Sequence, residues 1–224
     1  MAVRGETVVS LEGMYDLGST FGNATLAPGT NLLVSGPPLS GKRRMALDVL
    51  AHGSERGEGV IVVTTRDSAN RVLNDYEALV SDPGSVDIGI VDCVTKHQGR
   101  SARDTDIVKY ASSPEDMTGI GIKFSEFVEE FRQERGIENV RVLVDSLSTL
   151  LMYSDVQTVF RFMHVFTSRI ENADAMGVHI IESTAHEEEA LNTLRQLFDH
   201  AVTVEENGSV STTIPDVALE PLER

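Results

Sequence analysis

The chain has 224 residues, of which 35 are acidic and 19 basic, giving a formal net charge of −16 at pH 7. This excess of acid disfavours non-specific binding to nucleic acid or to an anionic membrane. The sequence has no apolar run near the ~20 residues of a membrane span, no apolar signal-peptide stretch at its start and a single cysteine, Cys93, so we expect a cytoplasmic protein without an internal disulfide framework.

Lysine is scarce, with 4 lysines against 15 arginines. Acid excess with few lysines resembles proteins of salt-loving archaea, and an ordinary acidic cytosolic protein is the alternative. In a halophile the net charge would reflect adaptation to a salt-rich solvent and would say little about which partners the protein binds.

The first predicted core strand is the apolar run at 32–34, which follows a turn at 26–30. A loop rich in glycine and proline comes next, and then a helix-compatible segment at 41–53 with Gly53 as a plausible C-cap. The loop has the phosphate-loop spacing G-x-x-x-x-G-K, but Arg43 stands where that motif has serine or threonine.

Such a loop binds phosphate because its glycines let backbone N–H groups turn inward and because the helix N-terminus and Lys42 add positive charge. Arg43 lacks the hydroxyl that normally ligates Mg²⁺, so we expect ATP or ADP to bind with an altered metal site. A glycine-rich turn that binds nothing is the alternative. The predicted binding residues are Gly36, Pro37, Pro38, Leu39, Ser40, Gly41, Lys42, Arg43 and Arg44.

The run VIVVTT at 60–65 is typical of a strand buried on both faces. A predicted helix at 68–80 and a third strand at 86–91 follow. This β–α–β–α–β order implies a parallel sheet with right-handed crossovers.

Residues 93–121 are polar, and only 107–110 has the pattern of a strand. Lys96, His97, Arg100 and Arg103 make this segment locally basic. We expect either a solvated loop or a contact surface for a partner subunit or a ligand.

The remaining elements alternate between helices and strands and end in a hairpin at the turn signal Asn207-Gly208. Ser154 and Gln157 form a plausible capping box for the longest helix. We predict one domain over 1–215 with a frayed tail at 216–224. The predicted elements are a helix at 124–135, a strand at 140–145, a helix at 154–175, a strand at 177–184, a helix at 187–198 and strands at 201–205 and 209–214.

Asp145 ends the buried strand VRVLVD. Ligands of open α/β sheets bind beyond the carboxyl ends of the strands, so we expect this acid beside the phosphate loop. There it would orient the water shell of Mg²⁺.

Three segments carry a resemblance to a known family. VLVDSLSTLL at 142–151 resembles the second nucleotide motif of the RecA-like ATPases, especially of the KaiC-like branch. Residues 26–42 are similar to that branch's entry turn and phosphate loop, and residues 197–208 to its closing strand and hairpin. The resemblance spans roughly residues 8–210 and implies a RecA-like P-loop α/β fold, with a mainly parallel central sheet flanked by helices and a C-terminal β-hairpin.

The resemblance also implies where the chemistry departs from the family. KaiC-like members carry glutamates just after the second strand, where they activate the attacking water; Arg66 and Asp67 occupy those positions here. Arginine cannot act as a base, and Asp67 is one methylene shorter than glutamate. Together with Arg43, this predicts weak or absent hydrolysis by the catalytic candidates Lys42, Asp67 and Asp145.

Two further roles follow from the same resemblance. Arg43 and Arg66 are candidates to contact phosphate in place of Mg²⁺, the alternative being that they face solvent or acidic neighbours. Ser183 and Thr184 lie at the end of the predicted strand 177–184, where RecA-like proteins carry a polar group that senses the γ-phosphate.

We therefore expect an ATP- or ADP-binding KaiC-like regulatory or assembly module that self-associates or binds a protein partner. One alternative is a competent ATPase using Asp67 and Asp145, related to DNA repair or signalling. Another is a nucleotide-free scaffold for protein interactions. The acid excess and the lack of a recognisable DNA-binding module argue against a nucleic-acid partner.

Overall fold

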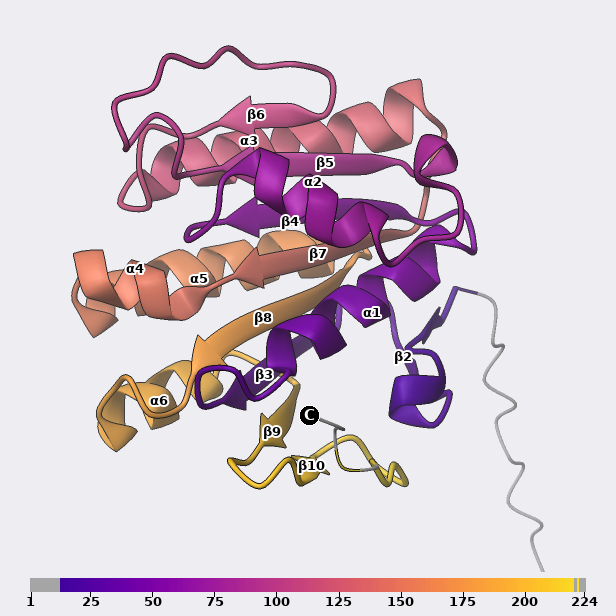
Figure 1. Cartoon of the computed structure of the whole chain (residues 1–224), viewed down its shortest axis with the longest axis vertical. Coiled ribbons are helices and arrows are strands. Elements are labelled where there is room, and N and C mark those ends of the chain that lie inside the picture. The colour runs from indigo at the N-terminus through magenta and orange to yellow at the C-terminus, as the bar shows by residue number, and fades with distance from the viewer. Residues whose placement is uncertain (1–12, 220, 222–224) are drawn as a thin grey trace, which may run out of the picture.

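An eight-stranded sheet runs through the computed structural model, which describes residues 13–219 and 221. The expectations for the first residues and for the end of the tail lie outside this range. The strands lie in the order β10-β9-β3-β8-β7-β4-β5-β6 (Figure 1). Their bounds are β3 Asn31–Gly36, β4 Gly59–Thr64, β5 Ile88–Asp92, β6 Val108–Tyr110, β7 Val140–Asp145, β8 Met176–Glu182, β9 His200–Val204 and β10 Val210–Thr212.

All neighbours from β9 to β6 pair in parallel, and β10 alone pairs antiparallel with β9. A separate two-stranded sheet joins β1 (Tyr15–Asp16) to β2 (Thr25–Leu26). The predicted α/β fold, with its mainly parallel sheet and C-terminal hairpin, is confirmed.

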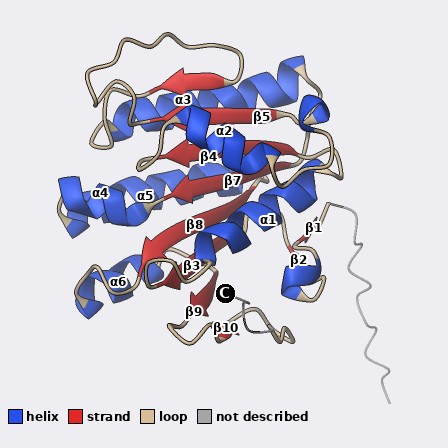
Figure 2. Cartoon of the chain, viewed as in Figure 1, coloured by secondary structure: helices blue, strands red, loops and turns tan. Residues whose placement is uncertain are grey.

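Helices cover both faces of the sheet (Figure 2). α1 (Lys42–Ser54) and α2 (Ala69–Glu77) pack on one face, and α3 (Met117–Glu129), α4 (Leu147–Tyr153), α5 (Val156–Asn172) and α6 (Glu188–Arg195) on the other. Short 3-10 turns lie at Ser19–Phe21 and Pro83–Ser85.

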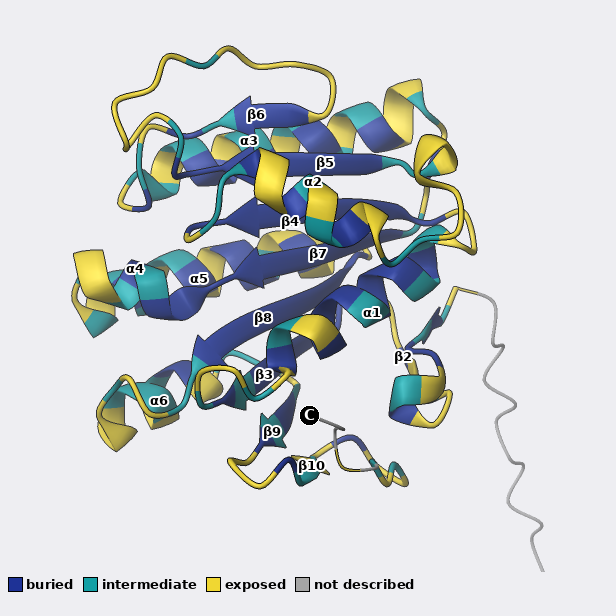
Figure 3. Cartoon of the chain, in the orientation of Figure 1, coloured by how far each residue is buried: buried dark blue, intermediate teal, exposed yellow. Residues whose placement is uncertain are grey.

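The central strands are mainly apolar because each buries both faces (Figure 3). In β4, Val60 and Val62 join the core beneath α1 and α2, whereas Ile61 and Val63 join the core beneath α3 to α6. This alternation follows from the two-residue period of a strand.

α3 begins seven residues before the predicted start at residue 124. The side chain of Asp116 caps it by accepting a 2.8 Å hydrogen bond from Gly119 N. Gly121 lies within the helix, and its carbonyl oxygen accepts a 2.7 Å hydrogen bond from Arg169 Nη1 of α5. The helix continues into a π turn, Glu130–Glu134. The predicted loop at 93–121 thus ends at residue 116.

Two predicted caps are wrong. The N-cap of α5 is Asp155, whose carboxylate accepts a 2.9 Å hydrogen bond from Thr158 N, and Ser154 instead follows the separate helix α4. Gly53 lies inside α1 and does not cap it. A Cβ at Gly53 would lie 2.3 Å from Arg141 Nε, so the glycine makes room for a buried arginine.

Within the segment expected as a tail, Val217 and Leu219 are partly buried and pack against the core beneath α1 and α2. In the described residues, no helix is both long enough and apolar enough to cross a membrane.

His179 is fully buried in β8, and its Nε2 lies 3.0 Å from Asn31 Oδ1. Burial lowers its pKa to about 3, from an ordinary value of 6.5. Below pH 6.5 the unfolded chain therefore takes up a proton here that the folded chain does not. The free energy of unfolding then falls with decreasing pH, by up to ~1.4 kcal/mol per unit.

We expect the protein to be less stable at pH 5 than at pH 7 by about 2 kcal/mol from this group alone. Urea unfolding of wild type and His179→Gln at both pH values measures it. The variant should lose this dependence, and the exposed His164→Gln should keep it. The same pH slope in wild type and His179→Gln would contradict the assignment.

Candidate functional site

The phosphate-loop residues connect β3 to α1 at the carboxyl edge of the sheet. Gly36 ends β3, and a Cβ there would lie 2.7 Å from Val204 O and 2.8 Å from Ser40 Oγ, so only glycine lets the loop close on β9. Gly41 has a φ of +90°, which favours glycine. Leu39 has a φ of +61° and is fully exposed at the loop's apex.

Hydrogen-bond donors gather inside this loop. The first turn of α1 leaves its backbone N–H groups without helical partners, and no side chain caps them. Ser40 Oγ is buried and has no partner. Pro37 and Pro38 contribute no N–H, so donors come from the second half of the loop.

Lys42 is 4% exposed at the start of α1. Its ammonium donates to Pro37 O at 2.8 Å and to Glu182 Oε2 at 2.7 Å. Glu182 ends β8 and lies opposite Gly36 in the parallel register. Ser183 and Thr184, the residues predicted to sense phosphate at this strand end, follow Glu182, and Glu182 is the residue that contacts the loop's lysine.

Arg43 lies among three carboxylates. Its Nε donates to Asp145 Oδ2 at 2.7 Å and its Nη1 to Asp75 Oδ2 at 2.6 Å, while Nη2 lies 3.8 Å from Asp67 Oδ2. Burial disfavours the charged guanidinium, but the hydrogen bonds and charges of Asp145 and Asp75 outweigh it and hold the pKa of Arg43 above its ordinary value. Arg43 therefore pairs with acidic neighbours, which is one of the two arrangements considered from the sequence.

Asp67 follows β4 and is surrounded by arginines. Besides Arg43, its carboxylate lies 3.3 Å from Arg66 Nε and 3.6 Å from Arg71 Nε. Arg66 is half-exposed and directed at Asp67. A base that activates water needs a free oxygen facing the nucleophile, and these ion pairs engage the carboxylate instead.

The structure brings Lys42, Arg43, Asp67 and Asp145 together but leaves the Arg44 side chain outside. Arg44 is 67% exposed and pairs with Asp48 one turn along α1. The contacts of Asp75 and Glu182 were missed, because nothing in the sequence says that Asp75 of α2 reaches Arg43 or that β8 lies beside β3.

The expected Mg²⁺ on Asp145 does not fit these side chains. Asp145 is 1% exposed, its Oδ2 is held by Arg43, and Arg43 also replaces the hydroxyl that would ligate the ion. The guanidinium thus supplies a positive charge where the motif places a metal. Over residues 13–219, no group of three or more His, Cys, Asp and Glu side chains is arranged to hold a metal ion.

Several polar atoms at the site are nevertheless buried without a partner. They are Ser40 Oγ, Arg43 Nη2, Asp145 Oδ1 and His186 Nε2. Buried polar groups are normally hydrogen-bonded, so such a cluster points to a ligand or to ordered water.

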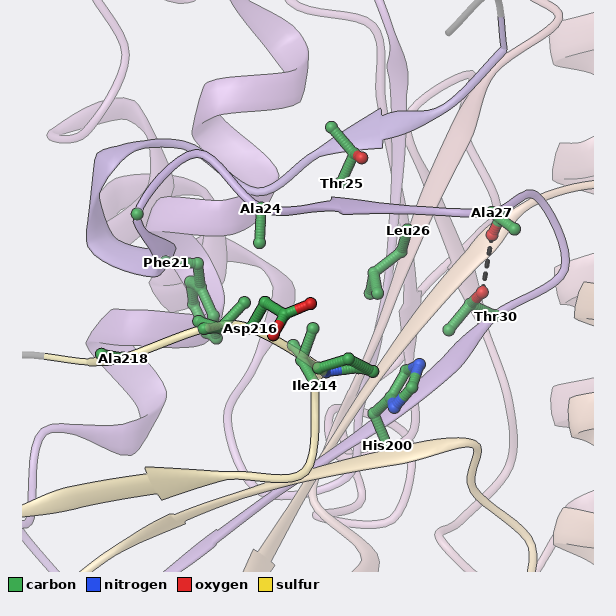
Figure 4. Close-up of a pocket in the computed structure, with 13 residues that line it drawn as sticks. Phe21, Ala24, Thr25, Leu26, Ala27, Thr30, His200, Ile214, Asp216 and Ala218 are labelled. Carbon is green, nitrogen blue, oxygen red and sulfur yellow. Dashed lines mark hydrogen bonds between the residues drawn. The ribbon is translucent and has the colours of Figure 1, made fainter. Parts of the chain in front are cut away.

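A separate cavity of about 650 Å³ lies at the other end of β3 (Figure 4). Its lining includes Thr30, just before β3, and His200, at the start of β9, together with the apolar side chains of Phe21, Leu26 and Ile214. Because the phosphate loop follows the carboxyl end of β3, this cavity does not belong to that site.

Comparisons with known proteins agree with the fold. The model of DUF7504, described as a family of unknown function, matches residues 29–204. No curated protein sequence matches this chain. The crystal structure of the KaiC-like protein PH0186 from the hyperthermophilic archaeon Pyrococcus horikoshii OT3 is similar, with a TM-score of 0.56 and 11% identity over 94% of this chain and 90% of that chain. The similarity shows a KaiC-like fold.

Proposed function

We infer the function of this chain from its site, because the chain belongs to DUF7504, a family of unknown function. We propose that it is a KaiC-like regulatory or assembly module that binds ATP or ADP at residues 36–43 and hydrolyses ATP weakly or not at all. One observation carries the proposal: a buried lysine and an unpartnered buried hydroxyl, Ser40 Oγ, lie where an uncapped helix begins. Together they form an anion site of the kind that holds nucleotide phosphates.

Weak hydrolysis follows from the ion pairs. Arg43 holds Asp145 Oδ2, and Arg43 and Arg66 face Asp67, so both carboxylates are engaged in ion pairs, with Asp145 Oδ1 left without a hydrogen-bond partner. The competent-ATPase alternative would require these pairs to open. The scaffold alternative has one observation in its favour: Lys42 already has a carboxylate partner in Glu182.

Calorimetry with ADP and with ATP tests the proposal. Lys42→Ala should weaken binding by about 1.5–3 kcal/mol, the range for a hydrogen bond to a charged group. Lys96→Ala, in the exposed loop after β5, is the matched control and should bind as wild type does. Equal affinities of wild type and Lys42→Ala would show that nucleotide does not bind at the phosphate loop.

The assembly role draws support from exposed apolar side chains near the same edge of the sheet. Leu39 is fully exposed at the loop apex, and Met152 is 78% exposed at the end of α4. Contiguous exposed apolar surface marks contact sites, and a subunit or partner packed against this edge would cover these two side chains. We therefore keep self-association, or a protein partner, as part of the proposal, with one nucleotide-binding domain over residues 1–215.

A further inference from the structure

Glu182 is a fixed carboxylate beside the phosphate loop. Its backbone N–H donates to Ser148 Oγ at 2.8 Å, and its backbone lies next to Gly36 in the parallel pairing of β3 and β8. Its side chain is 17% exposed, and Oε2 lies 2.7 Å from Lys42 Nζ. The carboxylate is therefore placed by the sheet and by the lysine together.

The lysine of a phosphate loop reaches the β- and γ-phosphates of a bound nucleotide. Glu182 thus holds an anionic oxygen against the ammonium that would contact the terminal phosphate. A γ-phosphate would enter next to this carboxylate, and two anions in a partly buried site repel each other strongly. The β-phosphate of a nucleoside diphosphate is the terminal one. It needs only the N–H groups of the loop and one hydrogen bond from the Lys42 ammonium.

The other positive charges of the site do not offset a γ-phosphate. Arg43 is already matched by Asp145 and Asp75, and Arg66 by Asp67. His186 carries an unpartnered Nε2 near Glu182, but burial lowers its pKa and favours the neutral ring. Mg²⁺ usually neutralises the terminal phosphates, and Arg43 stands in its place here.

We propose that this loop selects a nucleoside diphosphate over a triphosphate, that it binds the diphosphate without a divalent metal, and that Glu182 is the residue that rejects the γ-phosphate. This inference rests on the proposed nucleotide binding and makes it specific. The chain is then a diphosphate-bound module whose ligand is a product of reactions that transfer or cleave the γ-phosphate of a nucleoside triphosphate.

Calorimetry on the full chain, with ADP and ATP as probes, measures the selectivity in EDTA and again with Mg²⁺. Wild type should bind ADP at least tenfold more tightly than ATP, in both conditions. Glu182→Gln keeps the size of the side chain and an oxygen for Lys42 but removes the charge. It should raise the affinity for ATP more than that for ADP, so that the ratio falls toward one.

Glu188→Gln is the matched control. Glu188 is exposed at the start of α6, and its substitution removes the same charge a few residues from Glu182. It should leave the ratio unchanged. Failure to bind either nucleotide would refute the proposed function itself. Binding of ATP as tightly as ADP by wild type, or an equal effect of Glu182→Gln on both, would overturn this inference alone. Should Glu182→Gln not fold, the wild-type ratio still decides the selectivity.

Discussion

Replacing Glu58 with alanine is expected to lower the free energy of unfolding by about 3–5 kcal/mol, the usual cost of removing one partner from a buried ion pair. Arg141, in β7, is fully buried and donates to both Glu58 oxygens, through Nε at 2.7 Å and Nη2 at 2.9 Å. In addition, Nη1 donates to Val49 O and Nη2 to Asp16 O. Loss of the carboxylate leaves this guanidinium without a counter-charge in the core.

Urea unfolding measures the loss, and two variants separate its cause. Asp48→Ala breaks the exposed pair with Arg44 and should cost less than ~1 kcal/mol. Glu58→Leu combined with Arg141→Met removes both charges and should recover most of the stability, because apolar replacements of a buried pair are often neutral. A loss below ~1 kcal/mol in Glu58→Ala would show that the guanidinium regains water and is not a buried charge.

The strands could be predicted closely because burial on both faces leaves a strong pattern in the sequence. VRVLVD at 140–145 coincides with β7, and VIVVTT at 60–65 is shifted by one residue from β4. The start of α3 was missed because Gly119 and Gly121 suggest a loop, although Asp116 three residues before Gly119 is a capping signal. The hydrogen bond that Gly121 O accepts from Arg169 of α5 is a tertiary contact that local sequence does not encode.

For the site, the sequence placed the residues but not their partners. Lys42 and Asp145 follow from motifs that combine a glycine loop with the end of a buried strand. Their observed partners are Glu182 for Lys42 and Arg43 for Asp145. Both pairs depend on which strands and helices lie side by side in the fold. The spacing of residues within a motif cannot show that Arg43 forms an ion pair with Asp145, the acid expected to orient the water shell of a metal.

Arg43 stands where the motif places a metal, and its replacement by serine should convert the site into a metal site. Arg43→Ser leaves Asp145, Asp75 and Asp67 facing one another without the guanidinium. We expect the free energy of unfolding to fall by about 3 kcal/mol, because Asp145 is 1% exposed and loses its counter-charge.

Mg²⁺ should then recover part of the loss, since a serine hydroxyl and several carboxylates offer the oxygen ligands that the ion prefers. An ion concentration of ten times its dissociation constant would restore about 1.4 kcal/mol by mass action. Thermal and urea unfolding with and without Mg²⁺ measure this. Wild type should not respond, and Arg43→Ala, which lacks the hydroxyl, should recover less than Arg43→Ser. A wild type stabilised by Mg²⁺ as much as Arg43→Ser would show that the guanidinium does not stand in for the metal, because the ion would then bind with Arg43 still in place.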